Sequence, residues 1–196
     1  YWKGHEWWSA NKDQPTLTTQ PANQNYAKSN ADSRWYNEGS GSPFNATQTC
    51  ATLPNVNEMT WYADKGEPRW DKDELWTTMG HLYKGGMWFL KQANITGFRA
   101  DKAYDGIDWR TNEKDNNWTV SRTLPSVADA GNYFYLPALG NYYSGRLNYV
   151  GDTGYYWSSS ATPGGSYYAC GLYFYSGNVN VGNIYRGNGY RVDGFE

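Results

Sequence analysis

The sequence is poor in the residues that most often carry catalysis or bind metal ions, with two cysteines and two histidines among 196 residues. Its charges nearly balance, 17 basic against 19 acidic, for a net charge of -2. Nucleic acid and anionic membranes require clustered lysine and arginine, which this balance does not provide. No apolar run approaches the roughly 18 residues of a membrane-spanning helix. We therefore expect no nucleic-acid partner and no membrane span.

The residues that are present form no recognisable catalytic or metal-binding motif. His81 has no cysteine or second histidine at metal-ligand spacing, so we interpret it as structural. Ser158–Ser160 lack the glycine-flanked nucleophile elbow of serine hydrolases. The acidic stretch from Asp101 to Asn117 does not have EF-hand spacing, which favours a solvated loop. The sequence predicts no catalytic residue, no metal site and no cofactor.

The two cysteines leave two alternatives open. Cys50 and Cys170 form either one long-range disulfide or two free thiols, because sequence spacing alone does not fix disulfide geometry. The aromatic-, Asn- and Gly-rich composition is typical of bacterial surface proteins, so we expect an exported protein on the cell surface. No signal peptide is recognisable, and we expect the sequence to be a mature or excised part of a longer protein.

Aromatic residues, by contrast, are abundant, with 11 Trp and 19 Tyr. Of these tyrosines, 13 lie from Ser126 onward, in a stretch with few charged residues. A buried tyrosine hydroxyl needs a hydrogen-bond partner, so a core rarely contains so many. Paratopes use tyrosine for rigid contact area and Asn, Ser and Gly for adaptable hydrogen bonds. The last third of the sequence therefore predicts a recognition surface.

Composition divides the chain into two parts. Residues 1–49 are polar and irregular and predict a lead-in or embellishment, whereas residues 50–196 predict one folded domain. Asn55 and Glu58 stand at capping-box spacing and predict a helix from Val56 to Asp64.

A second helix is predicted just downstream. Asp71 and Glu74 repeat the helix-start signal, and apolar residues follow at helical spacing: Leu75, Met79 and Leu82. We interpret this stripe as core packing rather than as a cofactor site.

A β-hairpin is the clearest element near the end of the chain. Tyr168–Tyr175, a Ser176-Gly177 turn and Asn178–Ile184 have its pattern. Alternation along the strands directs one set of side chains to the core: Cys170, Leu172, Phe174, Val179 and Val181. The opposite face receives Gly171, Tyr173, Tyr175, Asn178 and Asn180.

Several motifs within residues 50–192 are shared with one family. They are Leu136-Pro137-Ala138-Leu139-Gly140, Tyr156-Trp157-Ser158-Ser159-Ser160, Gly189-Tyr190-Arg191-Val192 and the helix start Leu53-Pro54-Asn55-Val56. On these residues the sequence resembles a bacterial C-type-lectin-like domain, of the branch related to formylglycine-generating enzymes and known as the Fibrobacter-succinogenes-type paralogous domain. Similar domains end Bacteroidetes tip fimbrillins and the variable proteins of diversity-generating retroelements.

The resemblance implies an α+β, C-type-lectin-like fold that is used for binding, with two helices packed on a twisted antiparallel sheet and long loops. In retroelement-diversified relatives the variable positions lie on the last strands and loops, and the Tyr, Asn and Gly identities here fit their codons. Non-diversified relatives also carry Asn-rich hairpins, which leaves diversification open. The sequence lacks the calcium-binding motifs of animal lectins, and Cys50 and Cys170 lie far apart in sequence for the oxidase branch.

The leading hypothesis is a surface-displayed, adhesin-like module that binds a protein or glycan ligand. Its expected contact face consists of Tyr173, Tyr175, Asn178, Asn180, Asn183, Tyr185 and Asn188, with Tyr167 and Tyr168 at the rim. The alternative is a structural subunit whose tyrosine-rich face contacts neighbouring pilus or surface subunits. An enzyme of the oxidase branch ranks last, and we expect no enzymatic activity.

Overall fold

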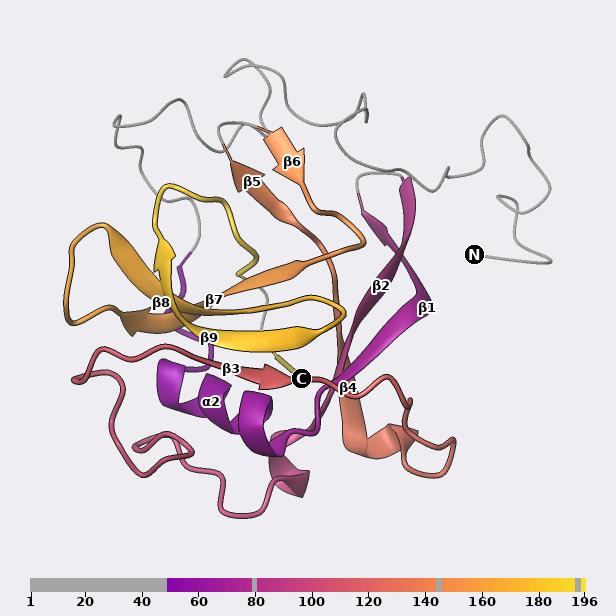
Figure 1. The fold of residues 1–196 in the computed structure, drawn as a ribbon, viewed down its shortest axis with the longest axis horizontal. Helices are drawn as coiled ribbons and strands as arrows, with labels where there is room; N and C mark the ends of the chain where they lie inside the picture. Colours follow the sequence, from indigo (N-terminus) through magenta and orange to yellow (C-terminus); the bar gives the residue numbers. More distant parts are fainter. Residues whose placement is uncertain (1–48, 79–80, 144–145, 193–194) are drawn as a thin grey trace.

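The computed structural model describes residues 49–78, 81–143, 146–192 and 195–196 (Figure 1). Apart from Thr49, the predicted lead-in of residues 1–49 lies outside these ranges. None of the helices within them has the length and apolar character of a membrane span.

The first predicted helix is present as α2, Val56–Lys65. Its capping box is complete: the Glu58 amide donates to Asn55 Oδ1 at 3.1 Å, and the Asn55 amide donates to Glu58 Oε2 at 2.7 Å. The Val56 amide donates to Ser160 Oγ at 3.0 Å, which ties the helix start to a distant strand. These bonds satisfy amides that a helix leaves unpaired at its N-terminus.

The prediction of a second helix is wrong. The segment forms two antiparallel strands, β1 (Arg69–Thr78) and β2 (His81–Leu90), with a bulge between Asp71 and Leu75. Asp71 Oδ1 accepts from the amides of Asp73 and Glu74, at 2.9 and 3.1 Å, as a helix cap would, but here it holds the bulge. Trp76 and Tyr83 pair across the strands and stack at 5.1 Å between ring centroids, a packing that favours the sheet.

Three antiparallel sheets organise the described residues. One has the order β1-β2-β4, with β4 at Tyr133–Pro137. The larger sheet has the order β3-β9-β8-β7, with β3 at Asn116–Thr119, β9 at Asn178–Tyr185, β8 at Tyr168–Phe174 and β7 at Gly154–Ala161. The third pairs β5 (Asn141–Tyr143) with β6 (Arg146–Asn148), and short 3-10 turns lie at Gln92–Asn94 and Ala130–Asn132.

The fold class is therefore mostly β-sheet with a single α-helix among the described residues, and the predicted two-helix α+β arrangement is wrong. The segment predicted as the second helix forms the β1–β2 hairpin instead, which extends from the body of the molecule in Figure 1. β-structure here rests on aromatic and β-branched residues that pack well on a pleated surface.

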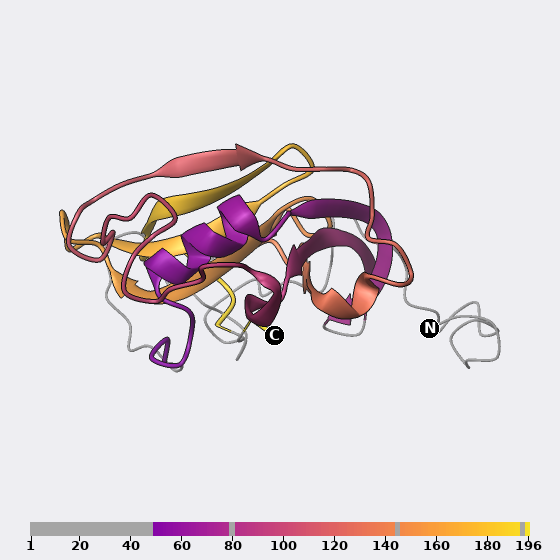
Figure 2. The same ribbon diagram turned by 90° about the horizontal axis from the view of Figure 1, so that it is seen from below.

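The main core lies where α2 and the two larger sheets meet. Helix α2 packs on one face of the four-stranded sheet, as Figures 1 and 2 show. Phe174, which is fully buried, contacts Trp70 of β1, Phe89 of β2 and Tyr156 of β7 through ring pairs with centroids 6.0–6.4 Å apart. One phenylalanine thus joins the two sheets.

Candidate ligand-binding face

The predicted hairpin forms as β8 and β9, joined at a turn in which the Tyr175 amide donates to the Asn178 carbonyl at 3.0 Å. All five side chains expected in the core are buried: Cys170, Leu172, Phe174, Val179 and Val181. They face α2, so the opposite face of the sheet, which we call the outer face, is the one that carries alternate residues of the hairpin.

The nine predicted contact residues do not share one face. Cross-strand partners point to the same side of a sheet, and the register pairs Tyr173 with Asn180 on the outer face. It pairs Cys170 with Asn183 and Tyr168 with Tyr185, so these lie on the helix side. The step from Asn180 to Asn183 is three residues, an odd number, which reverses the direction of the side chain.

Four predicted residues therefore meet on the outer face, and the neighbouring strand adds two more. Asn117 pairs with Asn180, and Thr119 pairs with Asn178, so both side chains join this surface from β3. We call the resulting set the open face: Tyr173, Tyr175, Asn178, Asn180, Asn117 and Thr119. Its members are exposed or half-buried.

Hydrogen bonds order the side chains of the open face. The Tyr175 hydroxyl contacts Asn178 Oδ1 at 3.3 Å, and Asn178 Nδ2 donates to Asn117 Oδ1 at 3.2 Å. Each link uses only part of an amide's capacity, since Asn offers two donors and an acceptor oxygen with two lone pairs. These hydrogen bonds therefore hold the side chains in place and leave further donors and acceptors of the asparagines for a binding partner.

Stacked aromatic rings cover the part of the outer face that lies beyond Tyr173, toward β7. Tyr173 stacks on Tyr155 at 5.8 Å between centroids, Tyr155 lies 4.7 Å from Tyr190, and Tyr190 stacks on Trp157 at 4.6 Å. Burial raises the pKa of the Tyr155 phenol to about 12. Together with Leu53 and Ile184 these rings form a second, smaller core. Tyr173 sits at the boundary between this core and the open face.

The remaining predicted residues occupy a different corner. Tyr168 and Tyr185 are exposed and meet edge to face at 6.4 Å, and Tyr167 is exposed beside them in sequence. Asn183 is occupied by structural bonds: its Oδ1 accepts from Thr162 at 2.8 Å, and its Nδ2 donates to Glu113 Oε1 at 2.6 Å. Asn188 lies in the segment after β9 and donates to the Tyr190 hydroxyl at 3.2 Å.

Both cysteines are free thiols, so of the two alternatives it is the unpaired one that is observed. Burial raises the pKa of Cys170 and of Cys50. A raised pKa lowers the thiolate fraction, which is the reverse of the change that activates a cysteine nucleophile. Within the described ranges, no three His, Cys, Asp or Glu side chains group as metal ligands would.

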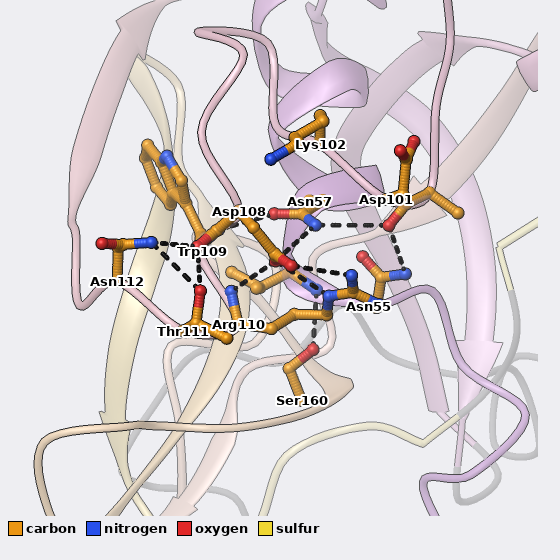
Figure 3. Close-up of polar contacts among 12 residues, drawn as sticks. Asn55, Asn57, Asp101, Lys102, Asp108, Trp109, Arg110, Thr111, Asn112 and Ser160 are labelled. Carbon is orange, nitrogen blue, oxygen red and sulfur yellow. Dashed lines mark hydrogen bonds and ion pairs between the residues drawn. The ribbon is translucent and has the colours of Figure 1, made fainter.

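A dense polar network anchors the long segment between β2 and β3 to helix α2 (Figure 3). Asn57 is fully buried, and its Nδ2 donates to the Ala100 carbonyl at 3.2 Å and to Asp108 Oδ1 at 2.9 Å. Its Oδ1 accepts from the Trp109 amide at 2.8 Å. Asp108 also accepts from the Arg110 guanidinium at 2.8 Å. Both amide donors of Asn57 are used internally, so we interpret this network as structural.

The network predicts a pH-dependent contribution to stability from Asp108. The hydrogen-bonded Arg110 guanidinium holds the pKa of this carboxyl well below its usual range, and the Asn57 amide lowers it further. A carboxyl with a lowered folded-state pKa stabilises the fold above its unfolded pKa, near 4, and this contribution is lost as the pH falls. Urea unfolding should show wild type more stable than Asp108→Asn at pH 7, with a smaller difference at pH 3. An equal difference at both pH values contradicts the assignment.

No protein-family model, curated protein or solved structure matches the chain. The resemblance to C-type-lectin-like domains stays a prediction that these comparisons do not test.

Proposed function

We propose that the protein is a ligand-binding, adhesin-like module displayed at a bacterial surface, and that the open face contacts the ligand. The observation that carries this proposal is the gathering of Tyr175, Asn178, Asn180, Asn117 and Thr119 on one accessible sheet face. The opposite face of the same strands is packed core, so the surface has a rigid backing.

The chemistry of the open face suits recognition of a polar, uncharged surface. A tyrosine ring gives a large contact area with few rotatable bonds, so little conformational entropy is lost on binding. Asparagine and threonine side chains provide donors and acceptors without net charge. Rigid support and partly unused hydrogen-bonding groups together favour binding over a purely architectural role.

The test begins with ligand discovery and ends with matched variants. A glycan array and a pull-down from bacterial and host-cell surfaces identify a ligand for the wild-type protein. Tyr175→Ala should then weaken binding by about tenfold, as expected for an interface tyrosine worth 1–2 kcal/mol. Tyr143→Ala removes a tyrosine of β5 that is more exposed than Tyr175 and lies outside the open face, and this variant should bind like wild type.

Two outcomes contradict the proposal. Equal ligand binding by Tyr175→Ala and wild type would show that the open face does not contact the ligand. A Tyr175→Ala protein that binds the ligand normally but fails to assemble into fibres would favour the structural subunit instead.

A further inference from the structure

Strand β3 pairs with one strand of the described part of the chain, β9, and has a second backbone edge that faces away from it. The Val120 amide donates to the Gly177 carbonyl at 3.3 Å, and the register then pairs Trp118 with Val179. Backbone groups along an antiparallel strand alternate in direction, so the even-numbered residues bond β9. The amide and carbonyl groups of Asn117 and Thr119 therefore point to the other side.

The same edge is used two residues further on. The Ser121 amide donates to the Pro68 carbonyl at 3.0 Å, and the Trp70 amide donates to the Ser121 carbonyl at 2.8 Å. This is a parallel bridge between Arg69 and Ser121 at the start of β1. Up to Thr119, no hydrogen bond to another described residue covers the edge, and β3 is the outermost strand in Figure 2. The edge thus already accepts a strand at one end.

A pocket of about 490 Å³ lies against this edge. It is lined by Ala63, Asp64, Glu67, Pro68, Arg69, Trp118, Thr119 and Ser121. Glu67 and Arg69 of this lining form an ion pair at 2.6 Å, so Asp64 supplies the lining's net charge of -1. Asp64 Oδ1 accepts from Trp118 Nε1 at 2.7 Å, and its buried Oδ2 lies 2.8 Å from the Lys65 ammonium. The Lys65 side chain is 57% exposed, whereas that of Asp64 is 16% exposed, so the lysine end of the pair can move away and leave its place beside Asp64 to another cation.

We propose that the edge of β3 binds an extended polypeptide by strand addition, with a lysine or arginine side chain of that polypeptide in the pocket. The inference deepens the proposed function and rests on it, because Asn117 and Thr119 offer their side chains to the open face and their backbones to the edge. It names the ligand class as protein, since the alternating donors and acceptors of a strand edge match another backbone.

The composition of β3 agrees with an edge that pairs with a further strand. Natural edge strands are commonly blunted with charged residues, proline or a bulge. The sequence Asn116-Asn117-Trp118-Thr119 contains no charge and no proline, and its pairing with β9 runs without a register shift. The strand is short, which limits unspecific pairing and leaves specificity to the neighbouring pocket.

Synthetic peptides test the proposal directly. The probe is a blocked Thr-Val-Thr-Lys-Thr-Val-Thr peptide, compared with the same peptide carrying Glu in place of Lys, in an NMR titration of the backbone amides. The lysine peptide should bind at least about fivefold more tightly, the scale of one exposed charge contact. The Asn117 and Thr119 amides should shift and become protected from solvent exchange.

Two variants separate the edge from the pocket. Asp64→Asn keeps the acceptor for Trp118 and should weaken the lysine peptide about fivefold, whereas Asp73→Asn removes an exposed charge elsewhere and should not. Thr119→Pro removes an outward amide without breaking a bond to β9 and should abolish binding. If this variant does not fold, a lysine peptide with N-methylated alternate amides makes the same test from the ligand side.

The outcomes also separate this inference from the proposed function. Equal affinity of the lysine and glutamate peptides, or unchanged peptide binding by Thr119→Pro, contradicts the proposed peptide site at the edge of β3. If the protein binds a glycan in a way that depends on Tyr175 and binds no peptide, the proposed peptide site at the edge of β3 is wrong. The open face then stays a ligand site. Absence of any ligand for either surface overturns both.

Discussion

Replacing Phe174 with alanine should lower the free energy of unfolding by about 3–5 kcal/mol, the usual cost of truncating a buried phenylalanine. The ring is fully buried and contacts aromatic residues of β1, β2 and β7, so its loss leaves a cavity between the two sheets. Chemical unfolding followed by tryptophan fluorescence measures the change.

A second substitution makes this prediction specific to the packing. Gly154 pairs with Phe174 across the strands, and a methyl group on Gly154 would collide with the Phe174 ring. Gly154→Ala alone should therefore cost about 1–3 kcal/mol through overpacking. In the Phe174→Ala background the methyl enters the vacated space, so the double variant should be more stable than the sum of the single costs by about 1 kcal/mol or more.

A matched control excludes a general effect of adding alanine. Gly131 lies in an exposed turn, where an added methyl meets no atom within 4 Å. Gly131→Ala should leave stability nearly unchanged. Strict additivity of the two core substitutions would contradict the packing described here.

Replacing Asn57 with alanine should cost about 2–4 kcal/mol, because it leaves the buried Trp109 amide without its acceptor and removes two further hydrogen bonds. The Trp109 amide loses its acceptor, and the Ala100 carbonyl and Asp108 each lose a donor. We also expect the segment from residue 96 to 115 to become more sensitive to limited proteolysis. Hydrogen exchange at Trp109 measures the local effect.

The exposed Asn94 provides the control for Asn57. Its side chain donates to the Asn132 carbonyl at 3.1 Å at the surface, where water can replace the bond. Asn94→Ala should change stability by no more than about 0.5 kcal/mol. Similar losses from both asparagines would show that burial of the Asn57 network is not what stabilises the segment.

Elements specified by local chemistry could be predicted from the sequence. Helix α2 follows from the Asn55–Glu58 capping box, and the β8–β9 hairpin follows from alternation around a short turn. The β1–β2 hairpin was not predicted, because Asp71 bonds the next amides equally well in a bulge and in a helix cap. Apolar spacing alone does not separate a short helix from a paired strand.

The candidate site could be predicted only in part, for two physical reasons. Tyr173, Tyr175, Asn178 and Asn180 follow from strand alternation, but Asn183 and Tyr185 reverse direction after an odd step along β9. Asn117 and Thr119 come from a strand paired with β9 across about sixty residues, and local patterns carry no signal of that partner.

The pairing of β3 with β9 also bears on the order in which the molecule assembles. The β8–β9 hairpin closes a short turn, whereas β3 joins it only after the chain has closed between Asn117 and Asn178, which are 61 positions apart in sequence. Closing such a loop costs more chain entropy, and contacts between distant residues form slowly. Four of the six open-face residues can therefore come together early in the local hairpin, and the two on β3, which carry the free edge, join late in folding.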